Sequence, residues 1–158
     1  MIIISDTSAI SNLFAIGRIE LLQALFQEVF IPDAVFEELQ VLKDQSAFLN
    51  QTPWIKVRTP QNAAMVADLM VNLDRGEAEA IALAIELRAD MLIIDEKRGR
   101  EKARTFGIPV IGLLGVLLKA KVNGVLPLLK PVMEELIQKT NFFMSQELIS
   151  EVMKQAGE

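Results

Sequence analysis

The sequence Met91-Leu92-Ile93-Ile94-Asp95 joins four consecutive apolar residues to an acid. A short apolar run of this length is typical of a strand that is buried on both faces of a sheet. A second run, Ile2-Ile3-Ile4-Ser5, leads to Asp6 in the same way. Helical patterns separate these runs, and this alternation predicts an α/β fold with a mostly parallel sheet.

The other elements follow from periodicity and from turn-forming residues. We expect further strands and helical segments at the following ranges: strands at 28–31, 54–57 and 110–111, and helical patterns at 8–26, 33–42, 61–73, 74–89 and 97–106. From about residue 112 the chain is expected to be helical, with Asn123-Gly124 as a turn, and the tail from Asn141 is either an amphipathic helix or a partner-binding arm. A length of 158 residues fits one domain that covers residues 1–158.

The chain contains no histidine, no cysteine and no tyrosine. This excludes a histidine general base, a thiolate nucleophile and a zinc site with imidazole or thiolate ligands. Oxygen ligands prefer hard cations, so Mg²⁺ or Mn²⁺ is the metal class to expect. The net charge of -5 argues against nucleic-acid binding in general. A nuclease with a metal-filled acidic cleft can nevertheless combine a negative total with a local basic patch.

Apolar residues are abundant, at 51% of the chain with a mean hydropathy of +0.33. This excess predicts a homo-oligomer, a homodimer or larger, in which some apolar surface is covered by another copy. The longest nearly apolar stretch, 106–118, is interrupted by glycine and proline and is too short for a membrane span. The N-terminus lacks the basic region of a signal peptide, and the absence of cysteine is compatible with a reducing compartment. We therefore expect a cytoplasmic protein that does not cross a membrane.

Two acids follow predicted strands directly. The carboxyl ends of parallel strands lie at one edge of a sheet, so Asp6 and Asp95 should meet although they are far apart in the sequence. Clustered carboxylates repel one another, and a divalent cation or a shared proton relieves this repulsion. Asp6 alone is equally explained as a helix N-cap, and Asp95 and Glu96 as turn residues. Glu38 alone is typical of a solvated glutamate on a helix of mixed polarity.

Glu77 and Glu79 lie in an Ala-rich helical segment. Glu79 is surrounded by residues too apolar for an unpaired charge, so it should have a partner. Glu77 stands three residues after Asp74, where a helix-capping partner is expected. On a regular helix the two glutamates point about 160° apart, so both reach one metal only if Glu77 precedes the helix.

Four segments carry a resemblance to a known family by their order and spacing: residues 4–8 (ISDTS), 31–39 (IPDAVFEEL), 73–84 (LDRGEAEAIALA) and 92–100 (LIIDEKRGR). Along nearly its whole length the chain resembles the PIN domain, a family of metal-dependent ribonucleases that includes the toxins of many prokaryotic toxin–antitoxin pairs. The resemblance implies a three-layer α/β/α fold around a central, mostly parallel, twisted sheet, with a helical C-terminal part from about 112.

The resemblance also implies a site. The catalytic acids would be Asp6, Glu38, Glu79 and Asp95, which hold one or two Mg²⁺ or Mn²⁺ ions. Glu77 and Glu96 are adjacent candidate ligands, and the choice within each neighbouring pair stays open. Ser8 would support a ligand rather than touch the ion.

The implied activity is hydrolysis of RNA phosphodiester bonds, with RNA as substrate and a cognate antitoxin as possible partner. Arg98 and Arg100 are candidates for holding the RNA backbone, although a solvated helix face explains the same charges. One alternative is a catalytically silent PIN-like domain that binds RNA or a protein. Another is a magnesium-dependent phosphatase with Asp6 as nucleophile, in which Ser8 stands where a second aspartate is needed.

Overall fold

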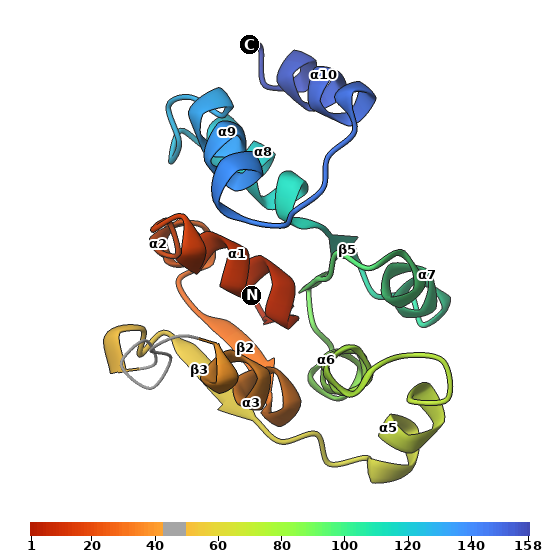
Figure 1. Cartoon of the computed structure of the whole chain (residues 1–158). Coiled ribbons are helices and arrows are strands. Elements are labelled where there is room, and N and C mark those ends of the chain that lie inside the picture. The colour runs from red at the N-terminus through yellow and green to blue at the C-terminus, as the bar shows by residue number, and fades with distance from the viewer. Residues whose placement is uncertain (43–49) are drawn as a thin grey trace.

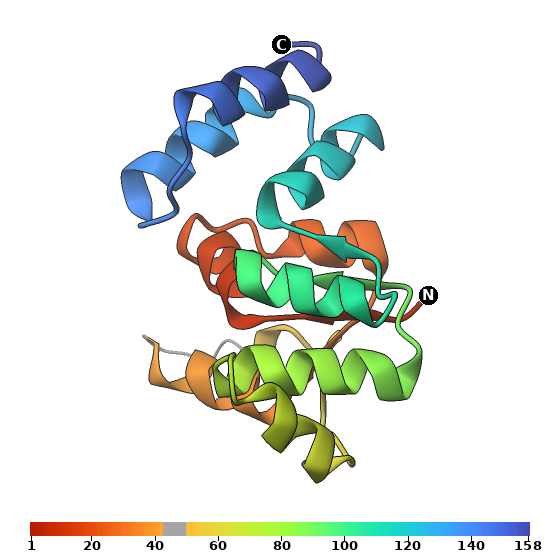
Figure 2. The same cartoon turned by 90° about the vertical axis from the view of Figure 1, so that its right-hand side faces the viewer.

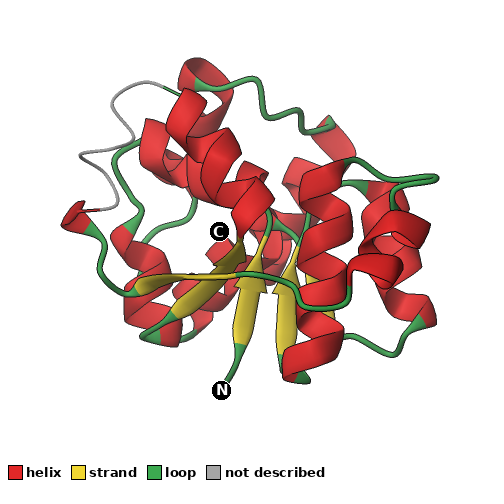
Figure 3. Ribbon diagram, turned by 90° about the horizontal axis from the view of Figure 1, so that it is seen from below, coloured by secondary structure: helices red, strands yellow, loops and turns green. Residues whose placement is uncertain are grey.

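A parallel β-sheet forms the centre of the molecule. The computed structural model describes residues 1–42 and 50–158, and within these ranges five strands form one sheet in the order β3-β2-β1-β4-β5. Every neighbouring pair is parallel, as the strand arrows in Figure 3 show. The strands are β1 (Ile3–Ser5), β2 (Val29–Pro32), β3 (Ile55–Arg58), β4 (Met91–Ile93) and β5 (Val110–Ile111). The predicted α/β fold with a parallel sheet is confirmed.

Helices connect the strands and continue beyond the last one. They are α1 (Thr7–Ala15), α2 (Glu20–Phe26), α3 (Asp33–Val41), α5 (Ala63–Leu69), α6 (Arg75–Leu87), α7 (Lys97–Thr105), α8 (Leu113–Val122), α9 (Lys130–Lys139) and α10 (Gln146–Gln155). The helical pattern expected at 8–26 is divided into α1 and α2. Gly17 lies between them with a φ of 69°, a left-handed conformation that glycine adopts without strain.

The sheet separates two apolar cores. Ile3 points into a core built with α1, α2, α8 and α9, whereas Ile4 points into a core built with α5, α6 and α7. Both isoleucines are fully buried, which explains why β1 is apolar at consecutive positions instead of alternating. The three-layer α/β/α arrangement thus follows from strands that must be covered on both faces.

The C-terminal helices form one end of the molecule. Figures 1 and 2 show α8, α9 and α10 together beyond the sheet, with α5 and α6 at the opposite end. The Arg18 guanidinium joins the α1–α2 turn to α9 through Glu135 at 3.1 Å. The carboxylate of Glu158 accepts the backbone N–H of Leu129 at 2.7 Å and pairs with Lys121 at 3.2 Å. In the part of the chain that the structure describes, no helix is both long and apolar enough to traverse a bilayer.

Candidate functional site

Asp6 and Asp95 meet at the carboxyl edge of the sheet. Strands β1 and β4 pair with Ser5 opposite Ile93, so the two strands end at the same level of the sheet. The backbone N–H of Asp6 donates to the Ile93 carbonyl at 2.9 Å, and the N–H of Asp95 donates to Asp6 Oδ2 at 3.3 Å. Asp95 Oδ1 in turn accepts the N–H of Leu113, the first residue of α8, at 2.8 Å. Backbone pairing therefore fixes both acids in place.

Glu77 is the third buried acid of this region. Its backbone N–H donates to Asp74 Oδ1 at 2.8 Å, so Asp74 caps α6 and Glu77 lies in the first helical turn. The Glu77 side chain lines a cavity of about 250 Å³ together with Asp6 and Glu38. Thr7 Oγ1 donates to Glu38 Oε2, which holds the exposed Glu38 at the rim. The cavity thus collects acids from β1, α3 and α6.

Glu79, which was expected among the catalytic acids, does not line the cavity that contains Asp6, Glu38 and Glu77. Glu79 faces α3, where its Oε1 accepts the N–H of Ala34 at 3.0 Å and its Oε2 pairs with Arg75 Nε at 2.7 Å. Since Glu77 and Glu79 point about 160° apart on the helix, the rotation that brings Glu77 to the acids takes Glu79 away. Arg75 is the partner that the apolar surroundings of Glu79 require, and its Nη1 also contacts Glu37 at 2.6 Å.

Protein groups compensate these acids only in part. Among the described residues, three buried carboxylate oxygens accept no hydrogen bond, namely Asp6 Oδ1, Glu77 Oε2 and Asp95 Oδ2. Burial, reinforced by the Asp95 charge, raises the pKa of Asp6 to about 8. Burial and the neighbouring Asp74 carboxyl raise the pKa of Glu77 to about 7, and burial also raises the pKa of Asp95. Unpaired buried acceptors of this kind are rare, and a bound cation or a proton would satisfy them.

These residues fit a hydrated divalent cation. Within residues 1–42 and 50–158, no three acidic side chains are arranged around one point as a complete ligand cage. Mg²⁺ does not need such a cage, because it commonly keeps several waters and binds through one or two carboxylates together with substrate phosphates. The unpaired oxygens of Asp6 and Asp95 supply two anionic donors on adjacent strands. The donor set contains only oxygen, which suits Mg²⁺ or Mn²⁺.

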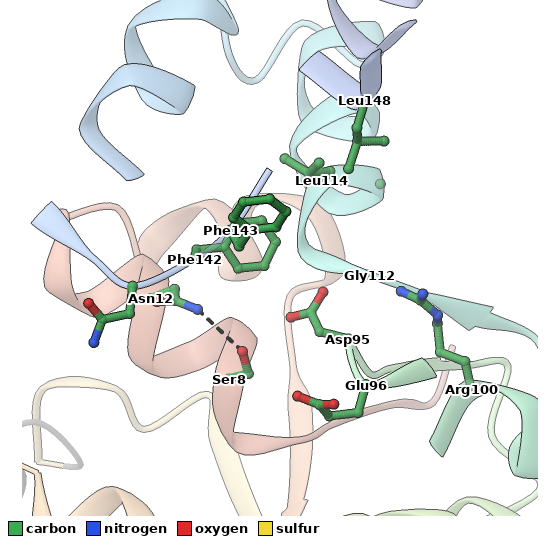
Figure 4. Close-up of a pocket in the computed structure, with 12 residues that line it drawn as sticks. Ser8, Asn12, Asp95, Glu96, Arg100, Gly112, Leu114, Phe142, Phe143 and Leu148 are labelled. Atoms are coloured by element: carbon green, nitrogen blue, oxygen red, sulfur yellow. Dashed lines mark hydrogen bonds between the residues drawn. The ribbon is translucent and has the colours of Figure 1, made fainter. Parts of the chain in front are cut away.

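A larger cavity adjoins the acidic one. Its volume is about 690 Å³, and it shares Ser8 and Glu96 with the smaller cavity. Figure 4 shows Asp95, Glu96 and Arg100 on one side of it and Phe142 and Phe143 on another. Asn12 Nδ2 donates to Ser8 Oγ at 3.2 Å. Arg100 therefore lies beside the acids, whereas Arg98 is exposed and lines neither of these two cavities.

Three glycines provide room for the carboxylates, and sequence reasoning missed them. A Cβ added at Gly112 would lie 2.9 Å from Asp95 Oδ1, and one at Gly76 would lie 2.6 Å from Glu38 Oε1. A Cβ at Gly99 would lie 2.8 Å from Glu77 Oε2 and 2.5 Å from a methyl group of Ile94. Gly76 and Gly99 lie within three residues of an acid in the sequence, whereas Gly112 does not, and only the folded chain shows which carboxylate each glycine accommodates.

Comparison with known proteins shows which family has this architecture. A family model described as a PIN domain (DUF3368) matches residues 2–158. The chain belongs to the PIN domain family. PIN domains are generally nucleases and usually bind divalent metals.

A solved structure of a PilT N-terminus domain protein from the hyperthermophilic archaeon Sulfolobus solfataricus P2 is similar in fold. It is 20% identical, with a TM-score of 0.51, and the match covers 92% of this chain and 99% of that one. No curated protein matches the chain. The likeness to this PIN-type structure supports the fold assigned above.

Proposed function

We propose that this PIN domain is an endoribonuclease that depends on Mg²⁺ or Mn²⁺ and hydrolyses RNA phosphodiester bonds. The observation that carries the proposal is the set of three buried, unpaired carboxylate oxygens on Asp6, Glu77 and Asp95. A protein that folds with such uncompensated acids loses stability unless a cation binds there. Membership in a family of nucleases supplies the reaction class.

Each acidic side chain has its own role in the proposed site, set by its position. Asp6 and Asp95 would hold the cation, because backbone hydrogen bonds engage Asp6 Oδ2 and Asp95 Oδ1 and leave the other oxygen of each carboxylate available to bind it. Glu77 and the rim acid Glu38 complete the anionic wall, with Glu96 at the boundary between the two cavities. A bound divalent ion would lower the pKa of a water and offset charge on the leaving oxygen.

Two other residues act on these acids or on the substrate. The Ser8 hydroxyl opposes part of the rise that burial causes in the pKa of Asp95 and so favours the charged form that a cation needs. The Arg100 charge opposes the same rise, and Arg100 is placed to contact an RNA phosphate entering the larger cavity. Glu79, in contrast, orders the start of α3 and thereby the helix that carries Glu38.

The test compares the wild-type protein with three variants on mixed RNA oligonucleotides in Mn²⁺, with and without chelator. Asp6→Asn and Glu77→Gln should abolish cleavage, whereas Glu79→Gln, whose carboxylate lies outside the cleft, should keep metal-dependent cleavage. Cleavage that resists chelator, or an Asp6→Asn variant as active as wild type, would contradict the proposal. Hydrolysis of a phosphomonoester with intact RNA would identify a phosphatase instead.

Calorimetric titration with Mn²⁺ examines the cation site without any substrate. Asp95→Asn should weaken binding at least tenfold, because it removes one of two adjacent anionic donors. Asp68→Asn, on the exposed surface of α5, is the matched control and should bind Mn²⁺ as wild type does. Equal Mn²⁺ binding by all three proteins would show that these acids do not form the site.

We further propose that the protein is the toxin of a toxin–antitoxin pair and that it forms a homodimer. The family supports the toxin role and the antitoxin partner. Exposed apolar side chains on the C-terminal helices support the homodimer. Val122 and Ile137 are 72% and 51% exposed. Induced expression should arrest bacterial growth for the wild-type protein and not for Asp6→Asn. Light scattering after gel filtration gives the oligomeric mass, and a monomeric mass would exclude the homodimer.

A further inference from the structure

The larger cavity has two chemically different sides. One side carries Asp95, Glu96 and Arg100 from the carboxyl edge of the sheet and α7. The other is apolar and aromatic, formed by Leu114 of α8 and by Phe142 and Phe143. Because the cavity shares Ser8 and Glu96 with the acidic cleft, a ligand in it would lie directly beside the candidate cation site.

Phe143 is the unusual residue of the aromatic side. Its side chain is 84% exposed, although an exposed phenylalanine gains nothing for the stability of the free protein. Phe142, its neighbour in the chain, is half-buried and packs against the apolar core, which anchors the segment between α9 and α10. The segment that Phe142 anchors therefore carries one exposed aromatic ring among the residues that line the cavity.

We propose that this cavity holds one base of a single-stranded RNA, stacked on Phe143, with the adjoining phosphate directed to Arg100 and the acidic cleft. The inference rests on the proposed nuclease function and specifies the form of its substrate. Aromatic rings accept any base face, and Arg pairs with phosphate, so the two sides of the cavity match the two parts of a nucleotide. Asn12 and Asn141 also line the cavity and offer amide groups to a base edge.

Charge and geometry favour a single strand over the other occupants. The protein carries a net charge of -5, so its overall field opposes RNA and stacking has to contribute much of the affinity. A base inside a duplex is already stacked and paired, and it would have to leave the helix to reach Phe143. The cavity volume of about 690 Å³ falls in the range of roughly 300–1,000 Å³ that is usual for sites enclosing small organic groups.

The test measures binding and not cleavage, so it is independent of the nuclease activity. Fluorescence anisotropy in chelator is recorded for dye-labelled RNA, using four homopolymers, a mixed-sequence strand and the same mixed sequence as a duplex. We expect Phe143→Ala to weaken single-strand binding about 5- to 100-fold and Phe143→Trp to retain it. The duplex should bind more weakly than the single strand. Phe106→Ala, an exposed phenylalanine beside a different cavity, is the matched control and should change nothing.

Abasic substitution makes the test specific. Removing one base at successive positions of the strand should weaken wild-type binding at one position, and this loss should be absent in Phe143→Ala, because the two changes remove the same contact. Arg100→Ala should also lower the dependence of affinity on salt by about one phosphate contact, whereas Arg98→Ala should not.

Three results would overturn the inference: no binding to any of the RNAs, equal affinity of wild type and Phe143→Ala, or equal affinity for single strand and duplex. If Phe143→Ala instead dissociates a dimer and leaves RNA affinity unchanged, the ring belongs to an interface between copies and the inference also fails. RNA that binds through Phe143 but is never cut would refute the proposed nuclease and leave this inference standing.

Discussion

Replacing Asp6 by Asn is expected to stabilise the metal-free protein while it removes a ligand of the proposed cation site. Asp6 is only 5% exposed, and its pKa rises from 3.8 to about 8 on folding. Between these two pH values the native state holds more protons than the unfolded state, so stability falls as the pH rises. Near pH 7.5 the carboxyl group costs about 5 kcal/mol relative to acid solution.

Asn keeps an oxygen that can accept the Asp95 N–H but removes the ionisation. The new amide group loses hydration in the same buried place, which takes back about 1–3 kcal/mol. The net gain should be about 2–4 kcal/mol, or roughly 4 to 15 °C in melting temperature for a domain of this size.

The assay is thermal unfolding in chelator at pH 5 and pH 7.5, followed by circular dichroism. The advantage of Asp6→Asn over wild type should be larger at pH 7.5 than at pH 5, and addition of Mg²⁺ should stabilise wild type and not Asp6→Asn. Asp68→Asn controls for the loss of one surface charge and should melt as wild type does at both pH values. An Asp6→Asn variant that melts at or below the wild-type temperature at pH 7.5 would refute the reasoning from burial.

Three further predictions address the other carboxylates. Glu79→Gln should lower stability by about 1–3 kcal/mol in denaturant titration, since it weakens the contacts that the buried Glu79 carboxylate makes with the exposed Arg75 guanidinium and the Ala34 N–H. It should leave Mn²⁺ affinity unchanged. A loss of Mn²⁺ binding equal to that of Glu77→Gln would place both glutamates in the site. Gly112→Ala should preserve the fold, because the backbone at Gly112 has an ordinary φ of −93°. It should weaken Mn²⁺ binding, because the added Cβ displaces the Asp95 carboxylate. Unchanged Mn²⁺ affinity would show that this carboxylate has room to move. The Mn²⁺ affinity of wild type should rise with pH up to about 8, because Asp6 and Glu77 must lose their protons to bind a cation. A Mn²⁺ affinity that stays constant between pH 6 and 8 would contradict these pKa values.

The sequence allowed the sheet and two of its acids to be predicted because strand ends are local features. Asp6 and Asp95 each follow an apolar run, and parallel pairing then brings them together without further information. The division of the first helical pattern at Gly17 was missed, since both halves carry apolar residues at helical spacing and only the backbone conformation of Gly17 separates them.

The rotation of α6 could not be predicted for a physical reason. Every residue from Gly76 to Ala84 is buried, so this helix has no polar face that would fix which side meets the sheet edge. The cap at Asp74 was the one local signal that Glu77 lies in the first turn of the helix, and it was open to a purely structural explanation. The aromatic side of the larger cavity was also missed, because Phe142 and Phe143 lie in a tail whose packing depends on contacts distant in sequence.

The hydrogen bond from the Asp95 N–H to Asp6 Oδ2 has a consequence for folding. It joins residues 89 positions apart, and it forms only when β1 and β4 have paired. A contact of this sequence separation closes a long loop and therefore costs more conformational entropy than a local contact does. No fragment that lacks either strand end can reproduce this pair of acids, so a cation held by both would report that β1 and β4 have paired. During synthesis, a nuclease built this way would remain inactive until its fourth strand has joined the first.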